Sequence, residues 1–76
     1  NWMNPSTHTK LEQNVIRTMK EFTKSSPMGS ITTGMLNLLI KPNCTTEDFI
    51  DLLDHMEHKG MLIGIPKGKT KRWRLD

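Results

Sequence analysis

The sequence predicts a small α+β domain of three helices followed by a C-terminal two-stranded β-hairpin. Apolar residues recur at helical spacing in three stretches between residues 10 and 59, whereas 61–75 contains two short runs typical of strands. Gly and Pro residues separate these stretches. With 76 residues, 34% of them hydrophobic, the chain is near the lower limit for folding on a single core.

The first predicted helix covers about residues 10–24. Its apolar stripe consists of Leu11, Val15, Ile16, Met19 and Phe22. Thr9 is the expected N-cap, because Glu12 completes a capping box three residues later. Residues 1–8 show no periodicity, so we expect a flexible lead-in before a domain that spans 9–76.

The second predicted helix covers about residues 33–40, with Thr32 or Thr33 as its cap. It is expected to bury Met35, Leu36 and Leu39, with Ile40 as a further candidate. A loop at 25–29 precedes it, and Ser30-Ile31 is either a single short strand or extended chain. Pro42 ends the helix, because the residue before a proline is pushed out of the α region.

The third predicted helix, at about residues 46–59, has the clearest pattern. One face carries apolar residues at i, i+3, i+4 and i+7, namely Phe49, Leu52, Leu53 and Met56. Thr45 is the expected N-cap, with Asp48 in a variant capping box. Gly60 is the expected C′ residue, because glycine adopts the left-handed conformation without strain.

Two strands are predicted at about 61–65 and 71–75, joined by the loop 66–70. The second strand alternates basic and apolar residues in the order Arg72, Trp73, Arg74 and Leu75. The Trp73 ring should therefore point inward and the guanidinium groups outward.

Helix, short strand, helix, turn, helix and hairpin is the order of the winged helix-turn-helix fold. Three short helices cannot close a core alone, so the hairpin, or wing, covers their open side. The wing residues expected to do this are Leu62, Ile65, Trp73 and Leu75.

The net charge of +3 conceals a marked segregation along the chain. Residues 47–57 carry five acids and no Lys or Arg, whereas residues 59–74 carry six bases and no acid. Such a domain has two electrostatic ends and is suited to two kinds of partner.

The acidic end lies on the outer face of the third helix. The residues expected to bind a partner there are Glu47, Asp51, Asp54 and His58. A recognition helix in a major groove would press these carboxylates towards phosphates, which is repulsive. The face is therefore either plain solvated surface or a landing site for a basic segment.

The basic end lies on the wing. The residues expected to contact nucleic acid are Lys67, Lys69, Lys71, Arg72 and Arg74. Cations on a loop contact phosphates without reading bases and give salt-sensitive affinity. The alternative is a solvated hairpin whose lysines protect a strand edge.

The chain resembles the C-terminal winged-helix domain of the middle subunit of replication protein A. The resemblance spans about residues 11–75 and rests on helix spacing, the Gln13-Asn14 pair, the acidic third helix, Gly60-Met61-Leu62 and the final aromatic strand. It implies a non-enzymatic docking module that recruits replication and repair factors through short helical peptides. The family's docking surface includes an acidic hairpin, whereas the wing is basic here.

A second resemblance, through Thr32-Thr33 and Trp73, is to the winged helices that bind Z-form nucleic acid. The polar and basic contacts that this family needs on its third helix are replaced here by residues such as Glu47, Ile50 and Asp51. Its activity is therefore not expected in this chain.

Metal binding and catalysis find little support in the sequence. His55 and His58 lie one turn apart, but their spacing matches no specific metal signature. The chain has no phosphate-binding glycine loop and no recognisable catalytic grouping, so we expect no metal, cofactor or enzymatic activity. Cys44 is the only cysteine, which excludes an internal disulfide.

The function expected from the sequence is protein docking within a DNA replication, repair or telomere-type single-stranded DNA-binding complex. Its partner would be a peptide or helix of a replication or repair factor, with auxiliary nucleic-acid contact through the wing. The alternative is a DNA-binding winged helix that contacts phosphates mainly through the wing. The chain begins at Asn1 rather than Met, so we expect it to be part of a longer protein. It shows no signal peptide or membrane span and has a single cysteine, so we expect it in the nucleus or another reducing compartment.

Overall fold

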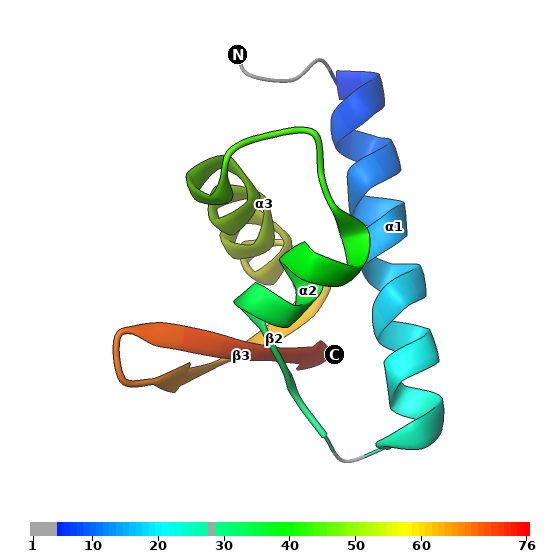
Figure 1. Ribbon diagram of the computed structural model, residues 1–76, viewed down its shortest axis with the longest axis vertical. Helices are drawn as coiled ribbons and strands as arrows, with labels where there is room; N and C mark the ends of the chain where they lie inside the picture. The colour runs from blue at the N-terminus through cyan, green and yellow to red at the C-terminus, as the bar shows by residue number, and fades with distance from the viewer. Residues whose placement is uncertain (1–4, 28) are drawn as a thin grey trace.

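The computed structural model describes residues 5–27 and 29–76, which form three helices and a three-stranded antiparallel sheet (Figure 1). The elements are α1 (Pro5–Ser25), β1 (Ile31–Thr32), α2 (Thr33–Ile40), α3 (Thr46–His58), β2 (Leu62–Lys67) and β3 (Thr70–Leu75). In Figure 1, α1 runs along one side of the domain and the β2–β3 turn projects from the other side. The α+β class predicted from the sequence is confirmed.

Helix α1 begins earlier than predicted, at Pro5. Proline suits a first helical turn, because its fixed φ is compatible with the helix and it lacks an N–H that would be unpaired there. Thr9 therefore lies inside the helix, and its prediction as N-cap is wrong. Of the predicted lead-in, residues 5–8 are helical, and residues 1–4, including Trp2, lie outside the described residues.

The ends of α2 and α3 carry the predicted caps. The Thr32 hydroxyl accepts a hydrogen bond from the Met35 N–H at 3.1 Å, and the Thr45 hydroxyl accepts one from the Asp48 N–H at 3.1 Å. Gly60 follows α3 with φ 80° and donates its N–H to the carbonyl of Glu57. Each cap pairs a backbone group that the helix itself leaves unsatisfied.

The sheet has one strand more than the predicted hairpin. Its order is β1-β3-β2, and Ile31 of the short β1 pairs with Trp73 of β3. Strand β2 pairs with β3 from Leu62 opposite Leu75 to Lys67 opposite Thr70. Only the two residues 68–69 remain as a turn, so the predicted five-residue loop is wrong. The additional strand β1 thus joins the middle of β3 to the segment that leads into α2.

The core draws on all three helices and the sheet. Its buried apolar residues are Leu11, Val15, Met19, Ile31, Leu36, Phe49, Leu52, Leu53, Met56, Leu62 and Trp73. Trp73 is 1% exposed, which confirms its predicted inward orientation. Met35, Leu39 and Ile65 were predicted to be buried but are 46%, 55% and 37% exposed. Helix α2 therefore anchors to the core through Leu36, with Ile40 packed at the margin.

Replacing Leu53 with alanine should destabilise the domain by about 2–5 kcal/mol, because it removes buried methyl groups and leaves a cavity. Leu53 is fully buried, whereas Leu38 is 65% exposed and provides the matched control. Urea unfolding followed by circular dichroism measures both variants. A loss well under about 1 kcal/mol for Leu53→Ala, or equal losses for the two variants, would contradict the assigned core.

Candidate interaction surfaces

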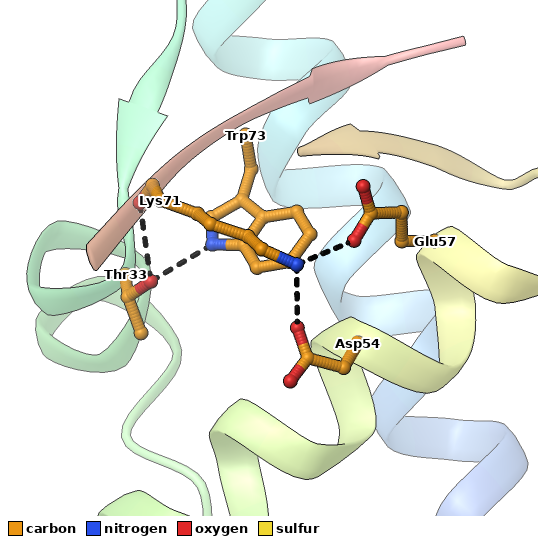
Figure 2. Close-up of polar contacts among 5 residues, drawn as sticks. All are labelled: Thr33, Asp54, Glu57, Lys71 and Trp73. Atoms are coloured by element: carbon orange, nitrogen blue, oxygen red, sulfur yellow. Dashed lines mark hydrogen bonds and ion pairs between the residues drawn. The ribbon is translucent and has the colours of Figure 1, made fainter. Parts of the chain in front are cut away.

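A polar cluster joins strand β3 to helices α2 and α3 (Figure 2). Lys71 Nζ lies 2.8 Å from Glu57 Oε1 and 3.3 Å from Asp54 Oδ1, both on α3. The Thr33 hydroxyl accepts the Trp73 Nε1–H at 2.8 Å and donates to the Lys71 carbonyl at 3.4 Å. Lys71 Nζ also lies 5.4 Å from the centre of the Trp73 ring, within range of a cation–π contact. These five residues are called the Lys71 cluster below.

The Lys71 cluster changes the proton affinity of its charged members. The hydrogen bond from Lys71 lowers the pKa of the Glu57 carboxyl, against the opposing effect of partial burial, and the N–H of Gly64 adds to the lowering. Hydrogen bonds to Glu57 and then Asp54 raise the pKa of Lys71. The pair of Glu57 and Lys71 therefore contributes its full stability when the pH is above the ordinary glutamate pKa. This contribution is lost as the pH falls through the lowered pKa that Glu57 has in the folded domain. At the alkaline end, the contribution is lost as the pH rises through the raised pKa of Lys71.

Gly64 allows β2 to lie close to the Glu57 carboxylate. A Cβ atom at this position would lie 2.7 Å from Glu57 Oε2, which is closer than side-chain atoms approach without displacement. Because glycine has no side chain, the backbone N–H of Gly64 lies close enough to the Glu57 carboxylate to help stabilise its charged form. Glycine at this position is thus part of the arrangement that holds the Lys71 cluster.

Contacts within the domain engage two of the five cations of the predicted basic wing and leave the others exposed. Lys71 is paired as described, and Arg72 donates to the Ser30 hydroxyl at 2.8 Å and to the Ser30 carbonyl at 2.6 Å. Lys67, Lys69 and Arg74 are exposed. The structure therefore leaves three of the five residues predicted to contact nucleic acid exposed, with no carboxylate at ion-pair distance among the described residues.

The outer face of α3 remains acidic. Glu47, Asp51 and His58 are exposed, and Asp54 is exposed as well although it shares Lys71 with Glu57. Within the described chain, no Lys or Arg side chain lies at ion-pair distance from Glu47 or Asp51. The structure thus places all four predicted partner-binding residues on one accessible helix face.

A hollow of about 210 Å³ lies beside this face, between α3, the start of α2 and the wing. It is called the Ile50 pocket and is lined by Thr33, Ile50, Asp54, Lys69, Thr70, Lys71 and Trp73. Ile50 is 38% exposed there, so an apolar side chain is available beside charges of both signs. The sequence alone does not mark Ile50 as part of a site, because the pocket around it forms only where the wing folds against α3.

An exposed apolar stripe runs along α2. Met35, Leu38 and Leu39 are 46%, 65% and 55% exposed, at spacing i, i+3 and i+4. Apolar residues surround this short helix, so periodicity alone does not distinguish its buried side from its exposed side. The sequence does contain a sign of this exposed stripe. Leu38, Leu39 and Ile40 are three consecutive apolar residues, and a helix cannot bury all three on one face.

The remaining candidate groups do not assemble into a metal site. His55 lies edge-on to His8, with ring centres 5.6 Å apart. In the described part of the chain, no three His, Cys, Asp or Glu side chains gather as potential ligands. Burial, and then the charge of Asp48, raises the pKa of the half-buried Cys44 thiol. Among the described helices, none has the length and apolar character needed to cross a bilayer.

Comparison with protein-family models, curated proteins and solved structures gave no match to this chain. The resemblance to the replication protein A domain therefore stays a prediction. The functional assignment depends on the surfaces themselves.

Replacing Gly64 with alanine should displace the Glu57 carboxylate and return its pKa towards the ordinary glutamate value. Net stability should change by less than about 1 kcal/mol, because alanine restricts the unfolded backbone and offsets part of the lost contact. NMR titration of the Glu57 carboxyl carbon measures the pKa. Gly34→Ala is the control, because a Cβ there meets no atom within 4 Å. An unchanged Glu57 pKa in Gly64→Ala would contradict the close packing described.

Proposed function

We propose that this chain is a non-enzymatic docking module of the winged-helix type, which captures a basic segment of a partner protein on the acidic face of α3. The order of helices and strands supports the winged-helix assignment, with β2 and β3 as the wing and β1 as its third strand. The resemblance to the replication protein A domain supports a setting in DNA replication, repair or a telomere-type single-stranded DNA-binding complex.

The observation that carries the proposal is the exposed row of carboxylates on α3. A helix-turn-helix protein that reads DNA places the outer face of its recognition helix against bases and phosphates. Here Glu47 and Asp51 have no cation within ion-pair distance in the described residues, and Asp54 shares one with Glu57. Phosphates would be repelled from this face, whereas lysine or arginine side chains of a peptide would be attracted.

The Ile50 pocket adds an apolar anchor next to these charges. Protein interfaces gain most of their affinity from a few desolvated anchor residues, and surrounding charges mainly provide specificity and speed of association. Ile50 and the adjacent wing residues form a pocket that can hold one apolar anchor residue of a partner, and Asp54 lines the same pocket. The partner expected from this geometry is a short amphipathic helix with Lys or Arg beside one apolar anchor.

The second candidate function is DNA binding through the wing. It is favoured by the exposure of Lys67, Lys69 and Arg74, which lie on the hairpin and are not paired to carboxylates in the described structure. A few phosphate contacts of this kind provide weak, sequence-independent and salt-dependent affinity. In the docking module they serve as an auxiliary contact.

Reversing two charges on α3, Glu47→Lys with Asp51→Lys, should weaken binding of a synthetic Lys- and Leu-containing amphipathic peptide by about tenfold or more. Both side chains are exposed, so the fold should be retained. Glu21→Lys with Asp76→Lys makes the same change in net charge at exposed positions elsewhere and should have little effect. Isothermal titration calorimetry measures affinity, and amide chemical shifts locate the peptide.

Equal weakening by the two pairs of substitutions, or shifts that avoid α3, would contradict the docking proposal. Titration with single-stranded and duplex DNA at two salt concentrations separates the second candidate. Tight DNA binding with a steep salt dependence, abolished by Lys67→Glu with Lys69→Glu, would make the wing the principal site.

A further inference from the structure

Helix α1 carries a basic stripe on its exposed face. The stripe consists of residues at alternating spacings of three and four, all of them exposed, namely the basic Lys10, Arg17, Lys20 and Lys24 together with the uncharged Gln13. Such spacing places the side chains on one face of a helix. Only Lys24 is paired with a carboxylate in the described structure, at 3.1 Å from exposed Glu21.

A groove of about 450 Å³ runs beside the middle of this stripe. Gln13, Arg17 and Lys20 line it from α1. Ile16 and Met61 also line it and are partly buried, packing against the core. Met61 immediately precedes β2, so α1 and the beginning of the wing form the groove together. It therefore combines an apolar surface with flexible cations.

The acidic residue in the groove is already neutralised within the domain. Glu12 is 7% exposed, and its Oε2 lies 2.7 Å from Lys59 Nζ and 3.4 Å from His8 Nδ1. No carboxylate of the described residues lies at ion-pair distance from Arg17 or Lys20. Arg17 donates instead to the uncharged side chain of Asn14. The groove consequently presents uncompensated positive charge.

We propose that this groove binds an acidic amphipathic segment of a partner protein. Apolar side chains of the segment would pack on Ile16 and Met61, and its Asp or Glu residues would pair with Arg17 and Lys20. Methionine is well suited to such a surface, because its unbranched side chain adapts to different apolar shapes. The long stems of Arg17 and Lys20 can cover apolar surface while their charged groups meet carboxylates at the rim.

Nucleic acid fits the groove less well than an acidic peptide. Phosphates need cations but derive no benefit from the apolar Ile16 and Met61 surface. Single-stranded nucleic acid is usually held by aromatic side chains on which bases stack, and the residues that line this groove include none. The two surfaces thus select opposite partners, with basic segments expected at α3 and acidic segments at α1.

The test uses a synthetic acidic peptide of about 15 residues, long enough to form a helix, with Leu and Phe on one face. Arg17→Glu with Lys20→Glu should weaken its binding by about tenfold or more. Lys67→Glu with Lys69→Glu changes the net charge equally on the wing and should alter the affinity by less than about twofold. Met61→Ser should also weaken binding, and Met61→Leu should restore it.

Two comparison ligands separate this proposal from general attraction of anions. One is the same peptide with its Leu and Phe residues changed to Ser, and the other is a single-stranded oligonucleotide of equal charge. Both should bind more weakly than the amphipathic peptide and should be insensitive to Met61→Ser. Equal binding of the three ligands, or equal losses in the α1 and wing variants, would overturn the proposal. Amide shifts that avoid Ile16, Arg17, Lys20 and Met61 would also overturn it.

Discussion

Lys71 links the wing to α3, because its side chain meets two carboxylates of α3 while its backbone belongs to the central strand of the sheet. This contact joins the end of the chain to the helix that carries the acidic face. It lies directly over Trp73, whose buried ring needs a partner for its N–H and finds it in Thr33. Packing of the largest core residue and pairing of charge are therefore satisfied by the same few residues.

The Lys71 cluster and the contact of Arg72 with Ser30 together determine which charges of the wing remain available to partners. Lys71 and Arg72 are held by groups of the domain itself, so the free cations of the wing lie towards its turn and at Arg74. On α3, the same contact uses Glu57 and part of the capacity of Asp54, whereas Glu47 and Asp51 remain exposed. Basic side chains on α1 form a further surface whose charge is opposite to that of α3. Partner selection in our account follows from this separation.

The sequence predicted the helices, the caps at Thr32, Thr45 and Gly60, and the buried Trp73, because these features depend on local spacing and on strong apolar periodicity. The sequence was wrong about burial in α2, because apolar residues occupy most positions of this helix and its exposed stripe looks the same as a buried one. The pairing of Lys71 and Arg72 was also out of reach, because their partners lie 14 to 42 residues away in the chain. The α1 groove has both Ile16 and Met61 in its lining, and tertiary packing sets this arrangement. Local rules therefore identify the elements, and long-range packing decides which charges are free.

The most direct test of this account is a double-mutant cycle between Lys71 and Glu57, using Lys71→Met, Glu57→Gln and the combined variant in urea unfolding. We predict a favourable coupling at neutral pH, within the range of about 0.2–1 kcal/mol for partly exposed ion pairs. The coupling should disappear as the pH falls through the lowered pKa of Glu57. A coupling of zero at neutral pH, or one that persists unchanged when Glu57 is protonated, would contradict the claim that this ion pair helps to hold the wing against α3.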